Sequence, residues 1–128
     1  MSFDLGVWQG DTALSDKEAA KLYVELCEGK RIPTEHPAVE AFYRELCSIY
    51  PEIDTLPADE VDNCPWSIAH DRSGSHVLMC MVWSRAEDVA AVVMDLAVKH
   101  GLICFDPQAT KVYLPPNLKP KRVRFRLW

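Results

Sequence analysis

Apolar and polar residues alternate along several segments of the chain, and this period of two predicts β-strands. In residues 3–8, Phe3, Leu5 and Val7 share one side of an extended segment, which is typical of a strand with one buried face. Five further segments with strand patterns are bounded by turn residues, at residues 66–70, 76–83, 102–105, 111–114 and 122–128. The first two of these five are separated by residues 71–75, which contain Ser-Gly and predict a hairpin turn.

A period of three to four residues replaces the alternation in three segments and predicts α-helices. The first helix is expected to begin at a capping box, residues 15–18, and to end at Gly29. The second has Pro37 in its first turn and ends before Pro51. The third is expected to begin at a second capping box, residues 84–87, and to end at a glycine.

The predicted element order is β-α-α-β-β-α-β-β, with an optional strand at the end. Its central part, β-α-β-β-α-β, is the split βαβ arrangement of ferredoxin-like folds. We therefore expect an α+β protein with a mostly antiparallel sheet, helices on one face, and the first and third strands in the centre. Residues 77–83 and 102–105 are apolar on both sides, so we expect either the C-terminal segment or another chain to cover the second face.

The composition is that of one globular domain. Of the 128 residues, 48% are apolar and 26% are charged, which favours a single domain over residues 1–128. Residues 115–128 are expected to form a basic C-terminal strand or tail. The longest apolar run is too short for a bilayer, and no signal peptide is visible. Five cysteines without a CxxC pair indicate reduced thiols and therefore a cytoplasmic location. Because no apolar run is long enough to span a bilayer, we also expect no membrane partner.

The charges are unevenly distributed along the chain. Residues 107–128 hold six bases and no acid, whereas Glu35 to Asp62 holds eight acids and one base. A solvated helix face followed by an acidic loop is the simplest interpretation of the acidic run, and an interaction surface is the alternative. Because an acidic field repels nucleic acid, we expect no nucleic-acid partner.

No sequence motif for catalysis, phosphate binding or a cofactor is present. His70 and His76 flank the hairpin with Asp71 between them, a set that could ligate a metal. A third protein ligand is not evident, so we interpret them as polar strand ends and expect neither a metal nor a cofactor. Cys64, in the acidic loop, is the cysteine that we expect to be most exposed, with a reactivity lowered by the surrounding acids. The sequence therefore indicates a binding protein and not an enzyme.

The loop at residues 52–65 is the predicted partner-binding site. Its two internal prolines and lack of periodicity indicate an irregular loop, and loops of this length are often functional. Trp66 follows it directly, and core packing is its default role, but tryptophan is also enriched at binding hot spots. The predicted partner-binding residues are Glu52, Asp54, Asp59, Glu60 and Asp62 as charged contacts and Trp66 as the anchor.

Three segments resemble a group of small bacterial proteins, some of which are similar to immunity proteins encoded beside polymorphic or contact-dependent toxins. These segments are residues 2–8, 83–87 and 101–108, and the resemblance covers about residues 2–114. The group has no shared catalytic motif, and residues 115–128 depart from its pattern. The resemblance implies a protein that binds a cognate toxin and occludes its active site, and the acidic surface favours a nuclease as that toxin.

A homodimeric ligand-binding or regulatory module is the alternative function. Ferredoxin-like chains often pair through the open face of their sheet. Met79, Met81 and Cys80 would line the contact between the two copies.

Overall fold

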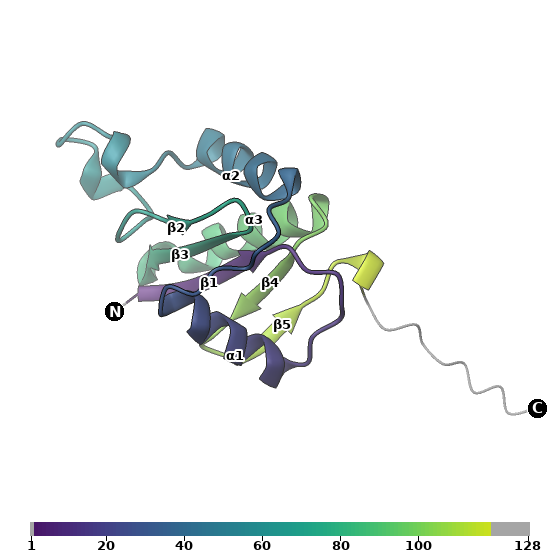
Figure 1. Cartoon of the computed structure of the whole chain (residues 1–128). Coiled ribbons are helices and arrows are strands. Elements are labelled where there is room, and N and C mark those ends of the chain that lie inside the picture. The colour runs from purple at the N-terminus through teal and green to yellow at the C-terminus, as the bar shows by residue number, and fades with distance from the viewer. Residues whose placement is uncertain (1, 119–128) are drawn as a thin grey trace, which may run out of the picture.

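The computed structural model describes residues 2–118, which form an antiparallel sheet of five strands and three α-helices (Figure 1). The strands are β1 (Ser2–Trp8), β2 (Asp71–Arg72), β3 (His76–Val82), β4 (Ile103–Asp106) and β5 (Lys111–Tyr113). The helices are α1 (Asp16–Cys27), α2 (Pro37–Ile49) and α3 (Ala86–Lys99). Short 3₁₀ turns occur at η1 (Ile53–Thr55), η2 (Val61–Asn63), η3 (Trp83–Arg85) and η4 (Pro116–Leu118). The predicted α+β class is confirmed, and the strand expected at residues 122–128 lies outside the described residues.

The strand order is β2-β3-β1-β4-β5, so β1 lies in the middle of the sheet. It pairs with β3 along its whole length, from Ser2 opposite Val82 to Trp8 opposite His76, and with β4 on its other side. The predicted central position of the first and third strands is confirmed. Because β3 and β4 both run antiparallel to β1, they are parallel to each other, and α3 connects them across β1.

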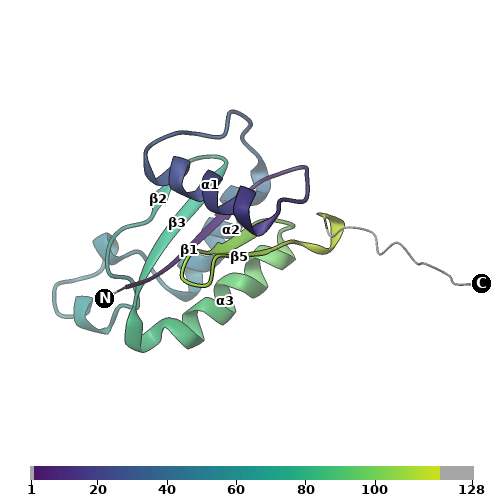
Figure 2. The same cartoon turned by 90° about the horizontal axis from the view of Figure 1, so that it is seen from below.

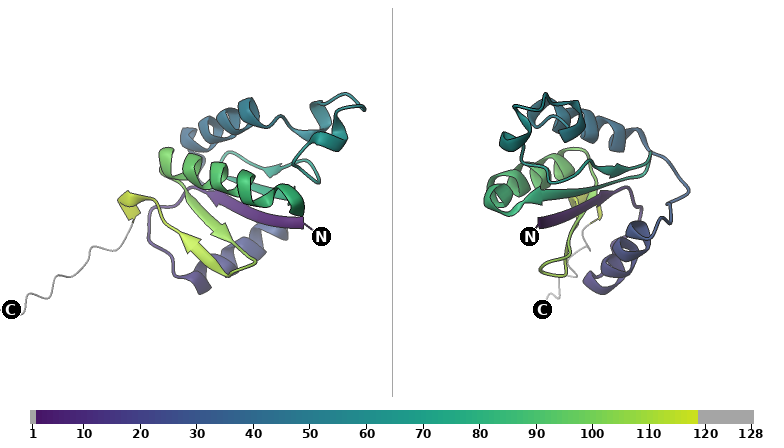
Figure 3. Two further views of the ribbon diagram at one scale, coloured as in Figure 1. Left: turned by 180° about the vertical axis from the view of Figure 1, so that it is seen from behind. Right: turned by 90° about the vertical axis from the view of Figure 1, so that its left-hand side faces the viewer.

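Helices cover both faces of the sheet, so the expectation that all helices share one face is wrong. Helices α2 and α3 pack on one face, against Leu5 and Val7 of β1. Helix α1 packs on the other face, against Trp8, Ile103 and Phe105 (Figures 2 and 3). Helices on both faces also explain the continuous apolar runs of β3 and β4, because alternate residues of each strand belong to the apolar clusters on opposite faces. The second face is thus covered mainly by α1, and Leu114 and Leu118, near the end of the described residues, also pack against its apolar cluster.

Helix α1 approaches β1 closely at Gly6. A Cβ atom on Gly6 would lie 2.9 Å from Cδ1 of Tyr23, a separation that real Cβ atoms do not show.

The capping box predicted at the start of this helix is confirmed. The amide of Glu18 donates to Ser15 Oγ at 3.1 Å, and the amide of Ser15 donates to Glu18 Oε1 at 2.9 Å.

Two local predictions are wrong. Residues 66–70 form no strand, and only one isolated bridge joins Trp66 to Met81, while β2 lies further on, where the turn was expected. The capping box expected at residues 84–87 is also absent. There the chain enters α3 through η3, and Arg85 stands at the N-cap without a side-chain hydrogen bond.

Candidate interaction surface

The acidic loop, residues 52–65, connects α2 to the segment before β2 and projects beyond the sheet at the left of Figure 1. Four of the predicted contacts lie on it and are exposed to solvent: Asp54, Asp59, Glu60 and Asp62. None of these four carboxylates forms an ion pair with a residue in the described range 2–118. The loop thus presents negative charge that the described part of the chain does not neutralise.

Glu52, the fifth predicted acidic contact, points inward. Its carboxylate accepts a hydrogen bond from the Tyr43 hydroxyl at 2.7 Å and another from the His70 amide at 3.0 Å. Tyr43 lies on α2, and His70 lies just before β2, so these two bonds hold the start of the loop to the rest of the fold. Glu52 therefore positions the loop and does not face a partner.

Trp66 holds the other end of the acidic loop. Its side chain is only 1% exposed, and its Nε1 donates to the carbonyl of Tyr50 at 3.1 Å. Its ring lies edge-on to His70, with the ring centroids 4.3 Å apart. The structure therefore corrects the assignment of Trp66 as a surface anchor, because it is a core residue between the loop and α2.

Two cavities lie beneath the acidic loop. The first, of 510 Å³, is called here the acidic-loop groove; among the residues that line it are Ile49, Leu56, Glu60, Asn63, Pro65 and Arg85. The second, of 610 Å³, shares Asn63, Cys64 and Arg85 with the first. The guanidinium of Arg85 donates to the carbonyl of Asn63 at 3.4 Å, which ties η2 to the start of α3. The loop thus borders hollows that have both apolar and charged lining.

An exposed tryptophan lies at the same end of the molecule. Trp83 in η3 is 54% exposed and its ring lies 5.8 Å from that of Phe3. Together with the N-terminal turn of α3 these two side chains border a cavity of 320 Å³. This exposure could not be predicted from the sequence, because Trp83 continues the apolar run of β3. It becomes exposed because the strand ends at Val82 and the chain turns into η3.

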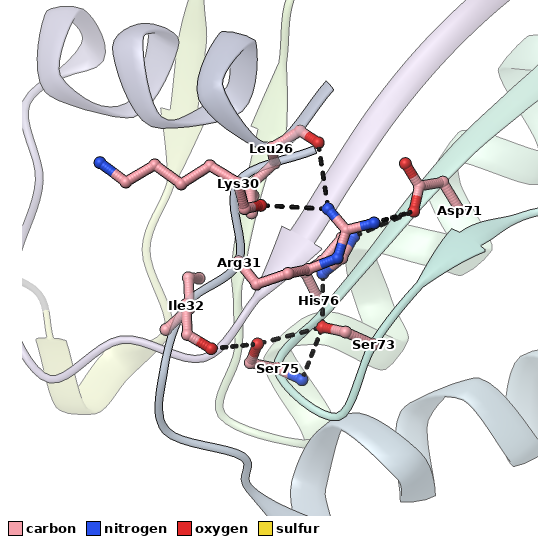
Figure 4. Close-up of polar contacts among 8 residues, drawn as sticks. All are labelled: Leu26, Lys30, Arg31, Ile32, Asp71, Ser73, Ser75 and His76. Atoms are coloured by element: carbon pink, nitrogen blue, oxygen red, sulfur yellow. Dashed lines mark hydrogen bonds and ion pairs between the residues drawn. The ribbon is translucent and has the colours of Figure 1, made fainter. Parts of the chain in front are cut away.

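Ser73, His76 and Asp71 form a chain of polar contacts at the hairpin between β2 and β3 (Figure 4). Ser73 Oγ lies 2.6 Å from His76 Nδ1, and His76 Nε2 lies 3.4 Å from Asp71 Oδ1. A serine, a histidine and an aspartate in series also occur in hydrolases, so this cluster is a candidate for nucleophilic chemistry.

The surroundings of Ser73 favour a structural role for this cluster. The Ser73 hydroxyl oxygen also accepts from the amide of Ser75 at 3.1 Å, a turn-stabilising bond. Ser75 Oγ in turn donates to the carbonyl of Ile32 at 3.0 Å, and Arg31 pairs with Asp71 at 3.2 Å. The cluster therefore joins the α1–α2 linker to the hairpin, and the Ser73 hydroxyl is engaged in the hydrogen bonds of its own turn.

Both histidines of the hairpin region are buried. Burial lowers the pKa of His70, although the nearby carboxylate of Glu52 acts in the opposite direction. Neither ring nitrogen of His70 has a hydrogen-bond partner among the described residues. Burial also lowers the pKa of His76, against the effect of Asp71. Across residues 2–118, no group of three or more His, Cys, Asp or Glu side chains is placed to hold a metal ion.

The cysteines differ from expectation in one respect. Cys64 is buried, with 6% exposure, whereas Cys27 at the end of α1 is exposed. Cys64 was expected to be the most exposed, but the end of the loop folds back against the core beside Trp66. Burial raises the pKa of both Cys80 and Cys104 to about 12, so neither is a thiolate at neutral pH.

The residues expected to line a homodimer contact do not form an open surface. Met79 and Met81 are 1% and 0% exposed and lie in the core cluster that includes α2 and α3 residues. Cys80 lies on the opposite side of β3 and is only half-buried. Contact through an exposed sheet face lined by both methionines is therefore ruled out.

Comparisons with protein-family models, curated proteins and solved structures found no match to this chain. None of the helices within residues 2–118 combines the length and apolar character needed to cross a membrane.

Proposed function

We propose that this protein is an immunity-type binder that neutralises a cognate bacterial toxin by covering the active site of that toxin. The observation that carries this proposal is the acidic loop itself. Asp54, Asp59, Glu60 and Asp62 are exposed, unpaired by any residue in the described part of the chain, and adjacent to a groove with apolar lining. Negative charge beside an apolar hollow suits a basic protein surface.

A nuclease is the toxin class that this surface suits best. A nuclease active site receives phosphate groups and therefore carries positive charge, which an acidic loop complements. The loop is also held at both ends, by Glu52 at its start and by Trp66 at its end. A surface that is fixed before binding loses less conformational entropy when it meets its partner.

The proposal includes a cytoplasmic location and the absence of catalytic turnover. The engagement of Ser73 Oγ within its own turn supports the second point. It also includes a ferredoxin-like fold, supported by the strand order β2-β3-β1-β4 and by the α3 connection between β3 and β4. In this description, α1 on the second face and β5 at the sheet edge are additions to the ferredoxin-like arrangement.

The test is whether this protein restores the growth of cells that express the protein encoded next to its gene. The variant Asp59→Lys/Glu60→Lys/Asp62→Lys reverses three exposed charges of the acidic loop. A matched control, Asp11→Lys/Glu28→Lys/Asp95→Lys, makes the same change in net charge at three exposed positions elsewhere. We expect the wild type and the control to restore growth and the loop variant to fail. A neighbouring product that is not toxic, or full protection by the loop variant, would contradict the proposal.

A further inference from the structure

The acidic-loop groove has an apolar part and a charged part that require different features of an occupant. Ile49 of α2 is 47% exposed and lines the groove together with Leu56, so an occupant can bury apolar side chains there. Glu60 and Arg85 both line it, and three further acids of the same loop, Asp54, Asp59 and Asp62, are exposed nearby, so the surroundings of the groove are negative on balance. A well-matched occupant therefore combines apolar side chains with basic ones.

The chain itself contains a segment with this chemistry. Residues 119–128, beyond the described part, carry five bases and no acid: Lys119, Lys121, Arg122, Arg124 and Arg126. Apolar residues are interleaved with these bases: Val123, Phe125, Leu127 and Trp128. We propose that residues 119–128 of a second copy of this chain dock in the acidic-loop groove.

The position of Leu118 favours a second copy over the same chain. Leu118 lines a cavity with His100 and Gly101, at the C-terminal end of α3, whereas Arg85, at the start of α3, lines the groove. Figure 1 shows the acidic loop and the last described residues at opposite sides of the molecule. The fourteen residues of α3 already span about 21 Å. A ten-residue segment reaches at most about 35 Å when fully extended, so it would have to follow the molecule from end to end.

If two copies lie side by side in antiparallel orientation, residues 119–128 do not have to follow the molecule from end to end. A two-fold axis then places Leu118 of each copy beside the groove of the other, so both segments dock by the same contact. The contact combines five bases with the exposed acids of the loop, so salt weakens it. This inference does not depend on the proposed immunity function; if both hold, a toxin and the second copy compete for one groove.

Sedimentation velocity of the full chain tests the proposal, at low and at high salt and at concentrations up to about 1 mM. The wild type is expected to form dimers that dissociate as salt rises. The variant Arg122→Glu/Arg124→Glu/Arg126→Glu is expected to weaken dimer formation by about tenfold or more. The control Lys17→Glu/Lys21→Glu/Lys30→Glu makes the same charge change at exposed positions in and just after α1 and is expected to dimerise like the wild type.

A charge-exchange experiment identifies the partner surface. At a concentration at which the wild type is dimeric, the variant Asp59→Lys/Glu60→Lys/Asp62→Lys is expected to be mostly monomeric, as is the variant with reversed arginines. Mixed together, the two variants restore both contacts, because each segment then meets a groove of opposite charge. We expect dimers in the mixture only, and no dimer in the mixture would overturn the proposal.

Two other results would also overturn it. One is a wild-type chain that stays monomeric at low salt. If this monomer fails to bind a synthetic peptide of residues 119–128 while the arginine-reversed variant binds it, the groove is occupied by the segment of the same chain. The other is a dimer whose stability is unchanged by reversal of the three arginines, which would place the contact elsewhere. Circular dichroism spectra like that of the wild type establish that each variant is folded.

Discussion

The side-chain amide of Gln108 takes the place of a strand residue opposite Asp4. Its Oε1 accepts from the Asp4 amide at 2.6 Å, and its Nε2 donates to the Asp4 carbonyl at 2.8 Å. Strand β4 ends at Asp106 and is followed by Pro107, while β1 continues to Ser2. Asp106 Oδ1 accepts from the backbone amide of Gln108 at 2.9 Å and from its Nε2 at 2.6 Å, and the second bond fixes the side chain that extends the ladder.

Replacement of Gln108 by alanine is predicted to lower the free energy of unfolding by about 1–2 kcal/mol, because two hydrogen bonds to the backbone are lost. The Asp4 amide should also exchange its hydrogen faster, whereas that of Leu5, which belongs to the β1–β3 side, should change little. Urea unfolding and amide exchange measure the two effects. Unchanged protection of the Asp4 amide would show that the side-chain pairing does not persist in solution.

Truncation to alanine is predicted to destabilise the protein much more at Trp66 than at Trp83. Trp66→Ala removes a buried ring and a hydrogen bond to Tyr50, so we expect a loss of about 3–5 kcal/mol in unfolding free energy. Trp83→Ala removes a half-exposed ring, so we expect a loss of about 1 kcal/mol or less. Equal losses in chemical unfolding would contradict the placement of Trp66 in the core and Trp83 at the surface.

Stability is predicted to fall as the pH decreases below about 6.5, the ordinary pKa of histidine. Burial lowers the pKa of His70 and of His76 in the folded state, so the unfolded chain binds more protons at mildly acidic pH. The stability that comes from keeping each buried histidine neutral is therefore fully present above the pKa that the histidine has in the unfolded chain. It is lost as the pH falls towards the lower pKa of the folded state. Each histidine contributes a slope of at most about 1.4 kcal/mol per pH unit, measurable by urea unfolding between about pH 5 and pH 8.

His70→Phe is the matched variant for this pH dependence. Neither nitrogen of His70 has a hydrogen-bond partner within the described residues, although Nε2 lies 3.9 Å from Glu52 Oε1. Its ring packs edge-on against Trp66 and Tyr43, so phenylalanine keeps the aromatic packing. We expect similar or higher stability at pH 7 and a shallower decline in acid. A slope equal to that of the wild type would show that His70 is not one of the titrating groups.

The sequence predicted most elements because local signals determine them. The Ser15 capping box and the alternation of β1 specify a helix start and a strand without help from distant residues. The side of the sheet covered by α1 could not be predicted, since an apolar stripe shows that a helix is buried but not which face it covers. Residues 66–70 have a strand pattern, but Trp66 turns into the core and β2 begins only at Asp71.

The candidate site was predicted only in part, because local features determine the position of the loop but contacts between distant residues determine the orientation of its side chains. The position of the acidic loop follows from its prolines and charges, which are local features. The inward orientation of Glu52 depends on Tyr43 and His70, which are 9 and 18 residues away in sequence and meet only in the folded chain. The exposure of Trp83 likewise depends on where β3 ends, which its continuous apolar run did not show.

The rate at which the purified chain associates with the product of the neighbouring gene shows whether the acidic loop binds a basic toxin surface. We expect fast association at low salt that slows as salt rises, and a rate at least about tenfold lower for Asp59→Lys/Glu60→Lys/Asp62→Lys. We expect no such loss for Asp11→Lys/Glu28→Lys/Asp95→Lys. Equal rates for the wild type and the loop variant at every salt concentration would contradict binding through the acidic loop.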